Sequence, residues 1–397
     1  MAKKPRVKIY FSEYFDLDAA VLHGYGAFNI SLVNDLPLFI DPFLLFNSAK
    51  PEYQALHEDI IKYVRFLRDK ARAGSLSPGL LKAWYTFPEV KQTWLGFSLF
   101  GNFGTGLGRD FAEALNRNLN KIFSGFDEDD KGISKGSHLE KLCLVDSGVG
   151  RDNISDFTTN LIKGYLLRYT EDFAKTYLRP DQRKRISVDK VKFNYATEKW
   201  ETGSFELPYI GGDHVILTPR DVLTKDDTWI NRDDLLGNLD DIANAVSDDQ
   251  LRAEISNYLS RKLDEAAGEK EPTKKQRREA LASALQEFPA LLDYYIRWKE
   301  NQGDQAEKRS AERVTESEEL FIQGVQNVVD KLADAGFYDV TPDTLDETRR
   351  RVAFFKNVIE NQDGYRWFTT KDGKKVGFDY EGCWEKIKHP VPKESAE

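Results

Sequence analysis

The stretch from Lys141 to Tyr177 constrains the fold most, because it joins an apolar run, a glycine turn and a long amphipathic segment. The run from Leu142 to Val145 is continuous and apolar, which is typical of a buried strand. From Ile154 to Tyr169, apolar residues recur at spacings of three and four, which predicts a helix packed against that strand's sheet. Such a unit places side chains where α/β proteins build clefts.

The whole chain predicts an α/β or α+β fold, with a mixed-sheet N-terminal body and a mostly helical C-terminal half. Strand patterns cover Arg6–Phe11, Phe28–Val33, Leu36–Phe46, Val188–Ala196, Lys199–Ile210, His214–Pro219 and a closing pair at Tyr365–Thr370 and Lys374–Tyr380. Helical patterns cover Glu52–Gly74, Phe111–Ile122, Leu251–Leu263, Glu279–Lys299 with a break at Pro289, Glu316–Leu332 and Leu345–Glu360.

Composition along the chain predicts three parts. Residues 1–237 form the mixed α/β body, and residues 238–336 form a helical segment. Two polar stretches in that segment, 268–278 and 302–313, are expected to be flexible linkers because they are charged and marked by glycine. Residues 337–397 form a small α+β end with a loose tail.

Hydropathy and cysteine usage predict a cytoplasmic protein without a membrane association. No apolar run approaches the ~20 residues that span a bilayer, and the first residues lack the apolar core of a secretion signal. The two cysteines, Cys143 and Cys383, are too few for a disulfide framework or a thiolate metal site.

The net charge of −9 argues against a globally basic nucleic-acid binder, but the charge is uneven. Nine acidic and two basic residues lie between Asp226 and Glu254, so this stretch alone contributes −7. Its acidic pairs favour helix caps and a solvated face over a cationic partner. The rest is nearly neutral, so nucleic acid remains a candidate partner through local basic faces, for example Lys274 to Arg278.

Two glycine turns share one pattern, glycine, apolar residue, glycine, arginine, aspartate, each at the entrance to a helix. The first contains Gly106, Gly108 and Arg109, and the second contains Gly148, Gly150 and Arg151. Free N–H groups at a helix start, with an arginine beside them, predict anion binding. The competing interpretation is structural, since glycines allow positive φ angles and aspartates cap helices.

Four aspartates are the candidate catalytic residues. Asp41 and Asp146 end apolar runs, where strand termini converge on clefts. Asp152 and Asp156 are four residues apart on one helix face, so both can point at one Mg²⁺ or Mn²⁺ ion. The structural alternative is that these aspartates form turns and caps. The chain has no zinc-hydrolase, serine-hydrolase or phosphate-binding loop motif.

Several runs resemble an uncharacterised prokaryotic family. They are LPLFIDPFLLFNS, LKAWYTFPEVKQTWLGFS, GVGRDNISDFTTNLI with YLLRYT, VILTPRDVLTKDDTWINR and VIENQDGYRWF. The resemblance implies longer members that continue into a C-terminal PD-(D/E)XK nuclease-like domain. Here only residues 369–397 follow Phe368, and they contain no aspartate followed by Glu-x-Lys. We therefore expect this chain to lack the nuclease domain.

Two hypotheses of function follow, and the sequence does not decide whether the protein is an enzyme. The first is a non-catalytic recognition or assembly protein, with a protein partner, in a prokaryotic nuclease-associated system such as phage defence. The second is a metal-dependent phosphodiester hydrolase that uses the aspartate cluster of Asp41, Asp146, Asp152 and Asp156.

Overall fold

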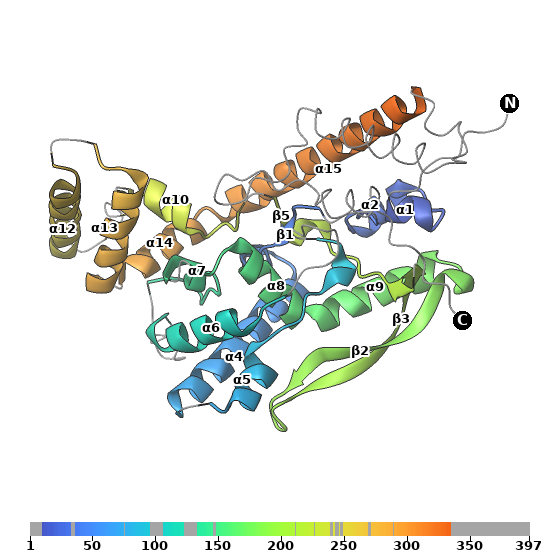
Figure 1. Cartoon of the computed structure of the whole chain (residues 1–397), viewed down its shortest axis with the longest axis horizontal. Coiled ribbons are helices and arrows are strands. Elements are labelled where there is room, and N and C mark those ends of the chain that lie inside the picture. Colours follow the sequence, from blue (N-terminus) through green and yellow to red (C-terminus); the bar gives the residue numbers. More distant parts are fainter. Residues whose placement is uncertain are drawn as a thin grey trace, which may run out of the picture. The chain divides into compact units, whose positions relative to one another are not determined.

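The structure is a computed structural model of the chain (Figure 1). It describes residues 10–334 apart from 33–35, 75, 96–105, 123–132, 146–147, 211, 226, 239–240, 243–245, 247–248, 269–270 and 289. The chain forms two compact units. One contains residues 1–97 and 104–313, and the other contains residues 98–103 and 314–397. The three-part division at residues 237 and 336 stays a prediction.

The fold is mixed α+β, as the sequence predicts. The two sheets of the described residues are antiparallel: a pair of β1 (Phe39–Ile40) with β5 (Leu223–Thr224), and a three-stranded sheet of β2 (Arg183–Asn194), β3 (Lys199–Ile210) and β4 (Asp213–His214). The predicted strand His214–Pro219 is therefore short. Its residues from Val215 to Thr218 are buried but pair with no strand over that length.

The N-terminal body is more helical than predicted. Its helices up to the central unit are α1 (Phe11–Tyr14), α2 (Ala19–Tyr25), α3 (Pro42–Asn47), α4 (Pro51–Arg72), α5 (Pro78–Tyr85) and α6 (Arg109–Ile122), with the 3₁₀ turn η1 (Lys91–Thr93). The predicted strand Leu36–Phe46 is wrong beyond Ile40. Asp41 caps α3 and Pro42 occupies its first turn, a combination that starts a helix.

The central unit also differs from the prediction. The apolar run that predicted a strand is a short helix, α7 (Lys141–Val145), in which Leu142 and Leu144 are buried. A short apolar run fits a buried strand or a buried helix equally well, which explains the error. The predicted helix is two helices, α8 (Arg151–Leu161) and α9 (Lys163–Tyr177), which meet at Ile162.

The hairpin of β2 and β3 is the main sheet, and α9 packs against it (Figure 1). Alternate residues make its inner face, so Val188, Phe205 and Leu207 are buried. An aromatic cluster of the core lies between the hairpin and α4. In it, Tyr63 contacts Phe193 and Trp200 at ring distances of 4.9 and 5.2 Å.

Helices dominate the C-terminal half, as predicted. They are α10 (Arg232–Gly237), α12 (Asp249–Ala267), α13 (Lys274–Glu287), α14 (Ala290–Glu300) and α15 (Gly303–Asp334). The break near Pro289 is confirmed, because α13 ends at Glu287 and α14 begins at Ala290.

The two polar stretches expected to be linkers are partly helical. Residues 303–313 are the start of α15, and residues 274–278 are the first turns of α13. Charged residues are as compatible with an exposed helix as with a coil. In addition, Thr273 and Gln276 form a capping box at the start of α13. The predicted strand Arg6–Phe11, the helix Leu345–Glu360 and the closing strand pair lie largely or wholly outside the described residues.

Candidate functional site

The first turn of α9 meets an irregular point in β2. The pairing of β2 with β3 shifts register between Val188 and Lys192, and Lys190 there has a left-handed backbone with φ of 55°. Gly164 lies against this bulge, where a Cβ would come within 2.8 Å of the Val191 carbonyl oxygen. Because Gly164 has no Cβ, α9 can approach closely, and the Nζ of Lys163 donates a 2.7 Å hydrogen bond to the Asp189 carbonyl.

Lys163 lines a cleft of about 220 Å³. Its walls are Pro88, Glu89, Val90, Gln92, Lys163, Ser187, Val188, Asp189, His214 and Ile216. The volume is below the ~300–1,000 Å³ of sites for drug-sized ligands, so the cleft suits a small chemical group.

The amine of Lys163 is almost enclosed, since the residue is 6% exposed. Burial lowers its pKa to about 8, and the nearby charge of Lys190 acts in the same direction, while Asp189 opposes them. Near neutral pH the amine therefore carries a charge that the protein only partly compensates.

His214 also lines this cleft. Its Nδ1 lies 2.9 Å from the Asp213 carboxylate, and its side chain is 10% exposed. Because a carboxylate only accepts, Nδ1 carries a proton. The other nitrogen, Nε2, is buried without a hydrogen-bond partner. Burial lowers the pKa of His214 although Asp213 raises it, so the neutral ring presents a lone pair at Nε2.

This arrangement can do two kinds of chemistry. Lys163, beside the positive end of the α9 dipole, can bind an anionic group, and His214 can accept a proton from it or donate one when charged. One oxygen of the Asp213 carboxylate accepts from the His214 Nδ1 and orients the ring. The other oxygen accepts a 3.0 Å hydrogen bond from the Gln92 Nε2. A histidine oriented by a carboxylate is also the usual form of a general base.

Carboxyl groups crowd on the Glu89 side of the cleft. Burial, together with the charges of Glu89 and Asp152, raises the pKa of Asp156 to about 8. The pKa of Asp152 is raised by burial, and that of Glu89 by burial and by Asp152. The structure thus brings two candidate aspartates together with a glutamate that sequence reasoning missed.

The metal interpretation of Asp152 and Asp156 stays a prediction. Asp146 lies outside the described residues. Within the part of the chain that the structure describes, no group of three or more histidine, cysteine or acidic side chains is arranged to hold a metal ion.

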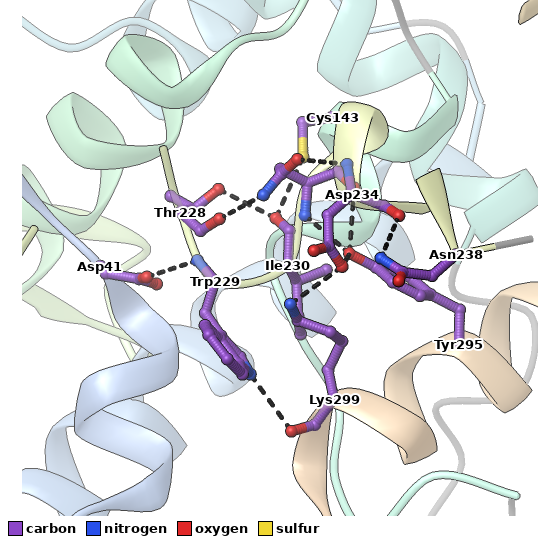
Figure 2. A network of polar contacts seen from close by, with 10 residues as sticks. Asp41, Cys143, Thr228, Trp229, Ile230, Asp234, Asn238, Tyr295 and Lys299 are labelled. Atoms are coloured by element: carbon purple, nitrogen blue, oxygen red, sulfur yellow. Dashed lines mark hydrogen bonds and ion pairs between the residues drawn. The ribbon is translucent and has the colours of Figure 1, made fainter. Parts of the chain in front are cut away.

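Asp41 belongs to a different cluster. It is 2% exposed, and its oxygens accept hydrogen bonds from the backbone N–H of Phe43 at 3.0 Å and of Trp229 at 2.7 Å (Figure 2). Burial raises its pKa to about 6, opposed by these two hydrogen bonds, and its charged neighbours are Asp227 and Lys299. Asp41 caps α3 and anchors the Trp229 segment.

The glycine turns find acceptors within the protein. The Gly106 N–H donates to Glu89 at 3.2 Å, and the Gly150 N–H donates to Asn153 at 2.9 Å. Anion binding there stays a prediction, because an added anion would compete with these acceptors. Gly108 and Gly148 flank the same turns.

The arginines of those turns have other contacts. Arg109 is exposed and pairs with Glu113 at 2.6 Å. The guanidinium of Arg151 lies 4.8 Å from the centroid of the Phe39 ring.

Sequence reasoning missed Lys163 and His214. The one usable signal was Asp213 directly before His214 at a glycine turn, which places a carboxylate beside the imidazole. Nothing in the sequence indicated that α9 begins at Lys163, because the helical pattern runs through Ile162.

Residues 16–231 match the family described as a domain of unknown function, DUF8370. The chain belongs to the DUF8370 family. Lys163, His214 and the four candidate aspartates all lie in the DUF8370 region, whereas Lys299 lies beyond it. No curated protein and no solved structure matches the chain. Within the described ranges, no helix combines the length and apolar character needed to cross a bilayer.

Proposed function

We propose that this DUF8370 protein is a non-catalytic recognition protein that binds a phosphate group in the cleft of Lys163 and His214. One observation carries the proposal: two nearly buried side chains that bind anions when charged line the same small cleft. The buried Nε2 of His214 lacks a protein partner, so a ligand would supply the missing hydrogen bond.

Phosphate suits these groups better than a neutral ligand. An anion beside Lys163 would stabilise the charged amine and reverse the effect of burial on its pKa. A phosphate that carries one proton can donate it to the Nε2 lone pair of His214. The Glu89 carboxylate lies on the cleft wall, but its raised pKa and its hydrogen bond from Gly106 reduce its repulsion of an anion.

Inorganic phosphate tests the proposal by its effect on the melting temperature and by calorimetric titration. Phosphate should raise the melting temperature of the wild type at pH 7, because a ligand that binds the folded state stabilises it. Lys163→Met and His214→Gln should each abolish the rise. The matched controls are Lys175→Met on the same helix and His23→Gln on α2, both at exposed positions. An unchanged phosphate response in both cleft variants would refute the proposal.

A metal-dependent phosphodiester hydrolase is the second candidate. The effect of Asp152 on the pKa of Asp156 supports it, because a divalent cation held by these two carboxylates and by water would relieve their repulsion. On this proposal, Mg²⁺ or Mn²⁺ should raise the melting temperature. Changing Asp152 and Asp156 together to asparagine should remove that rise, and also any metal-dependent cleavage of DNA or RNA.

We further propose that recognition serves a partner effector in a prokaryotic nuclease-associated system, such as phage defence. The support is the resemblance to a family whose longer members carry a nuclease-like domain. Co-expression with the products of neighbouring genes, followed by size-exclusion chromatography, tests it. A nuclease that co-elutes with the wild type at fixed stoichiometry is expected, and elution of the chain without any of these products would contradict it.

A further inference from the structure

The outer strand of the hairpin is strongly basic although the chain is acidic. The whole protein has a net charge of −9. Strand β2 contains the basic residues Arg183, Lys184, Arg185, Lys190 and Lys192 and the single acidic residue Asp189.

Part of this charge is exposed on the hairpin. Arg185 lies opposite Glu206, Lys192 opposite Glu201, and Lys199 opposite Asn194. The cations Arg185, Lys192 and Lys199 are exposed. The β2 edge away from β3 pairs with no other described strand.

The acidic residues of the hairpin have contacts within the protein. Glu206 pairs with Arg183 at 3.0 Å, and Glu198 with Lys70 at 2.6 Å. The Asn194 amide donates to Glu201 at 2.7 Å, and the Thr202 hydroxyl donates to Asp189 at 2.8 Å. These contacts partly neutralise the carboxylates, whereas Arg185, Lys192 and Lys199 are exposed on the same ribbon.

The same strand forms a wall of the cleft through Ser187, Val188 and Asp189. We infer that the β2–β3 ribbon binds a nucleic-acid backbone, one phosphate of which occupies the cleft of Lys163 and His214. The phosphate in the cleft rests on the function proposed above. The basic charge of the ribbon complements a polyanion, so the ligand we infer is a phosphodiester chain.

Ribbon geometry agrees with this ligand. A two-stranded antiparallel ribbon is one of the elements that fit the major groove of B-DNA. Lysine and arginine contacts to phosphates are independent of sequence, so affinity should depend strongly on salt and weakly on base order.

The test is fluorescence anisotropy with labelled 20-nucleotide probes between 50 and 200 mM salt. Duplex DNA, single-stranded DNA and single-stranded RNA are the three arms, and they distinguish the source of the backbone. In the variant Arg185→Ser/Lys192→Ser/Lys199→Ser, the slope of log K against log salt should fall by about 2–3, since each phosphate contact contributes about 0.7–0.9. Affinity at the lower salt concentration should fall at least tenfold.

The matched control is Arg261→Ser/Lys262→Ser/Lys308→Ser on α12 and α15, which changes the net charge equally. It should retain wild-type binding. No binding of any probe by the wild type, an unchanged slope in the ribbon variant, or a greater loss in the control would overturn the inference.

Phosphate titration separates the two proposals. The ribbon variant should still bind inorganic phosphate, because its substitutions lie outside the cleft. If the wild type binds the probes through the ribbon but does not bind phosphate, the cleft proposal fails and the ribbon alone binds the backbone.

Discussion

Trp229 and Lys299 contact each other at two points. The indole Nε1 donates to the Lys299 carbonyl at 3.2 Å, and the Lys299 ammonium lies 3.6 Å from the centroid of a Trp229 ring (Figure 2). The same ammonium pairs with Asp234 at 2.9 Å, and the Tyr295 hydroxyl lies 3.1 Å from that carboxylate. Helix α14 is thereby fastened to the end of the DUF8370 region.

Removing the Lys299 charge should destabilise the protein. Lys299 is 2% exposed, whereas the Asp234 side chain is 21% exposed, so water compensates part of the loss. Lys299→Met should lower the free energy of unfolding by about 1–3 kcal/mol, less than the ~3–5 kcal/mol of a fully buried pair. Urea unfolding checks this. The double variant Lys299→Met/Asp234→Asn should lose less free energy of unfolding than the two single variants lose together. Strictly additive losses would contradict a direct interaction between the two side chains.

Gly106→Ala should destabilise the protein, whereas Gly108→Ala should not. Gly106 has φ of +69°, and a Cβ there would lie 2.4 Å from the backbone nitrogen of Glu89. Strain of this kind costs about 1–3 kcal/mol, and the steric clash adds to it. Gly108 has open space where its Cβ would be, so it is the matched control. Equal melting temperatures for the two variants would show that the Gly106 contact is unimportant.

Phe157→Ala should lower the free energy of unfolding by about 3–5 kcal/mol, because this ring is fully buried in α8. Leu161→Ala should have a smaller effect, below about 2 kcal/mol, because Leu161 is only partly buried at the end of α8. Leu161 belongs to the three- and four-residue spacing from Ile154 to Tyr169, which by itself predicts a core position. Chemical denaturation of both variants measures the difference, and a larger loss for Leu161→Ala than for Phe157→Ala would show that Leu161 is a core residue.

Asp156→Asn should change how stability depends on pH. The folded protein raises the pKa of Asp156 from 3.8 to about 8, so it binds this proton more tightly than the unfolded chain does. The resulting stabilisation is full below pH 3.8 and is lost as pH rises towards 8. At about 1.4 kcal/mol per pKa unit, the effect is measurable. Thermal melts should show the variant gaining stability relative to the wild type between pH 5 and 9, and parallel curves would argue against a buried, crowded carboxyl.

The sequence predicted elements that carry strong local signals. The helices from Pro51 and from Arg109 have clear three- and four-residue spacing, and the hairpin of β2 and β3 has clear alternation. The strand predicted at Leu142–Val145 failed because a short apolar run is compatible with either structure. The stretch 302–313, expected to be a flexible linker, lies mostly in α15, because its charged residues suit an exposed helix equally well.

The site was harder to predict, because its residues come from distant segments. Glu89, Lys163 and His214 meet only after the β2 bulge and Gly164 set the approach of α9. The aspartate spacing predicted one helix face for Asp152 and Asp156, and both residues lie in α8. It could not show that Asp41 faces Trp229 instead, because that contact joins positions 188 residues apart.

The carboxylate of Glu300, the last residue of α14, holds a loop that lies far earlier in the chain. This carboxylate accepts hydrogen bonds from the backbone N–H groups of Lys135 and Gly136, at 2.6 and 2.9 Å, and lies 3.0 Å from the His138 Nε2. These partners precede Glu300 by more than 160 residues. The 135–138 loop can therefore form these hydrogen bonds only after residues up to Glu300 have been synthesised and packed against it. During synthesis, the matched DUF8370 region would emerge with this loop still unclosed, and α14 would complete it afterwards.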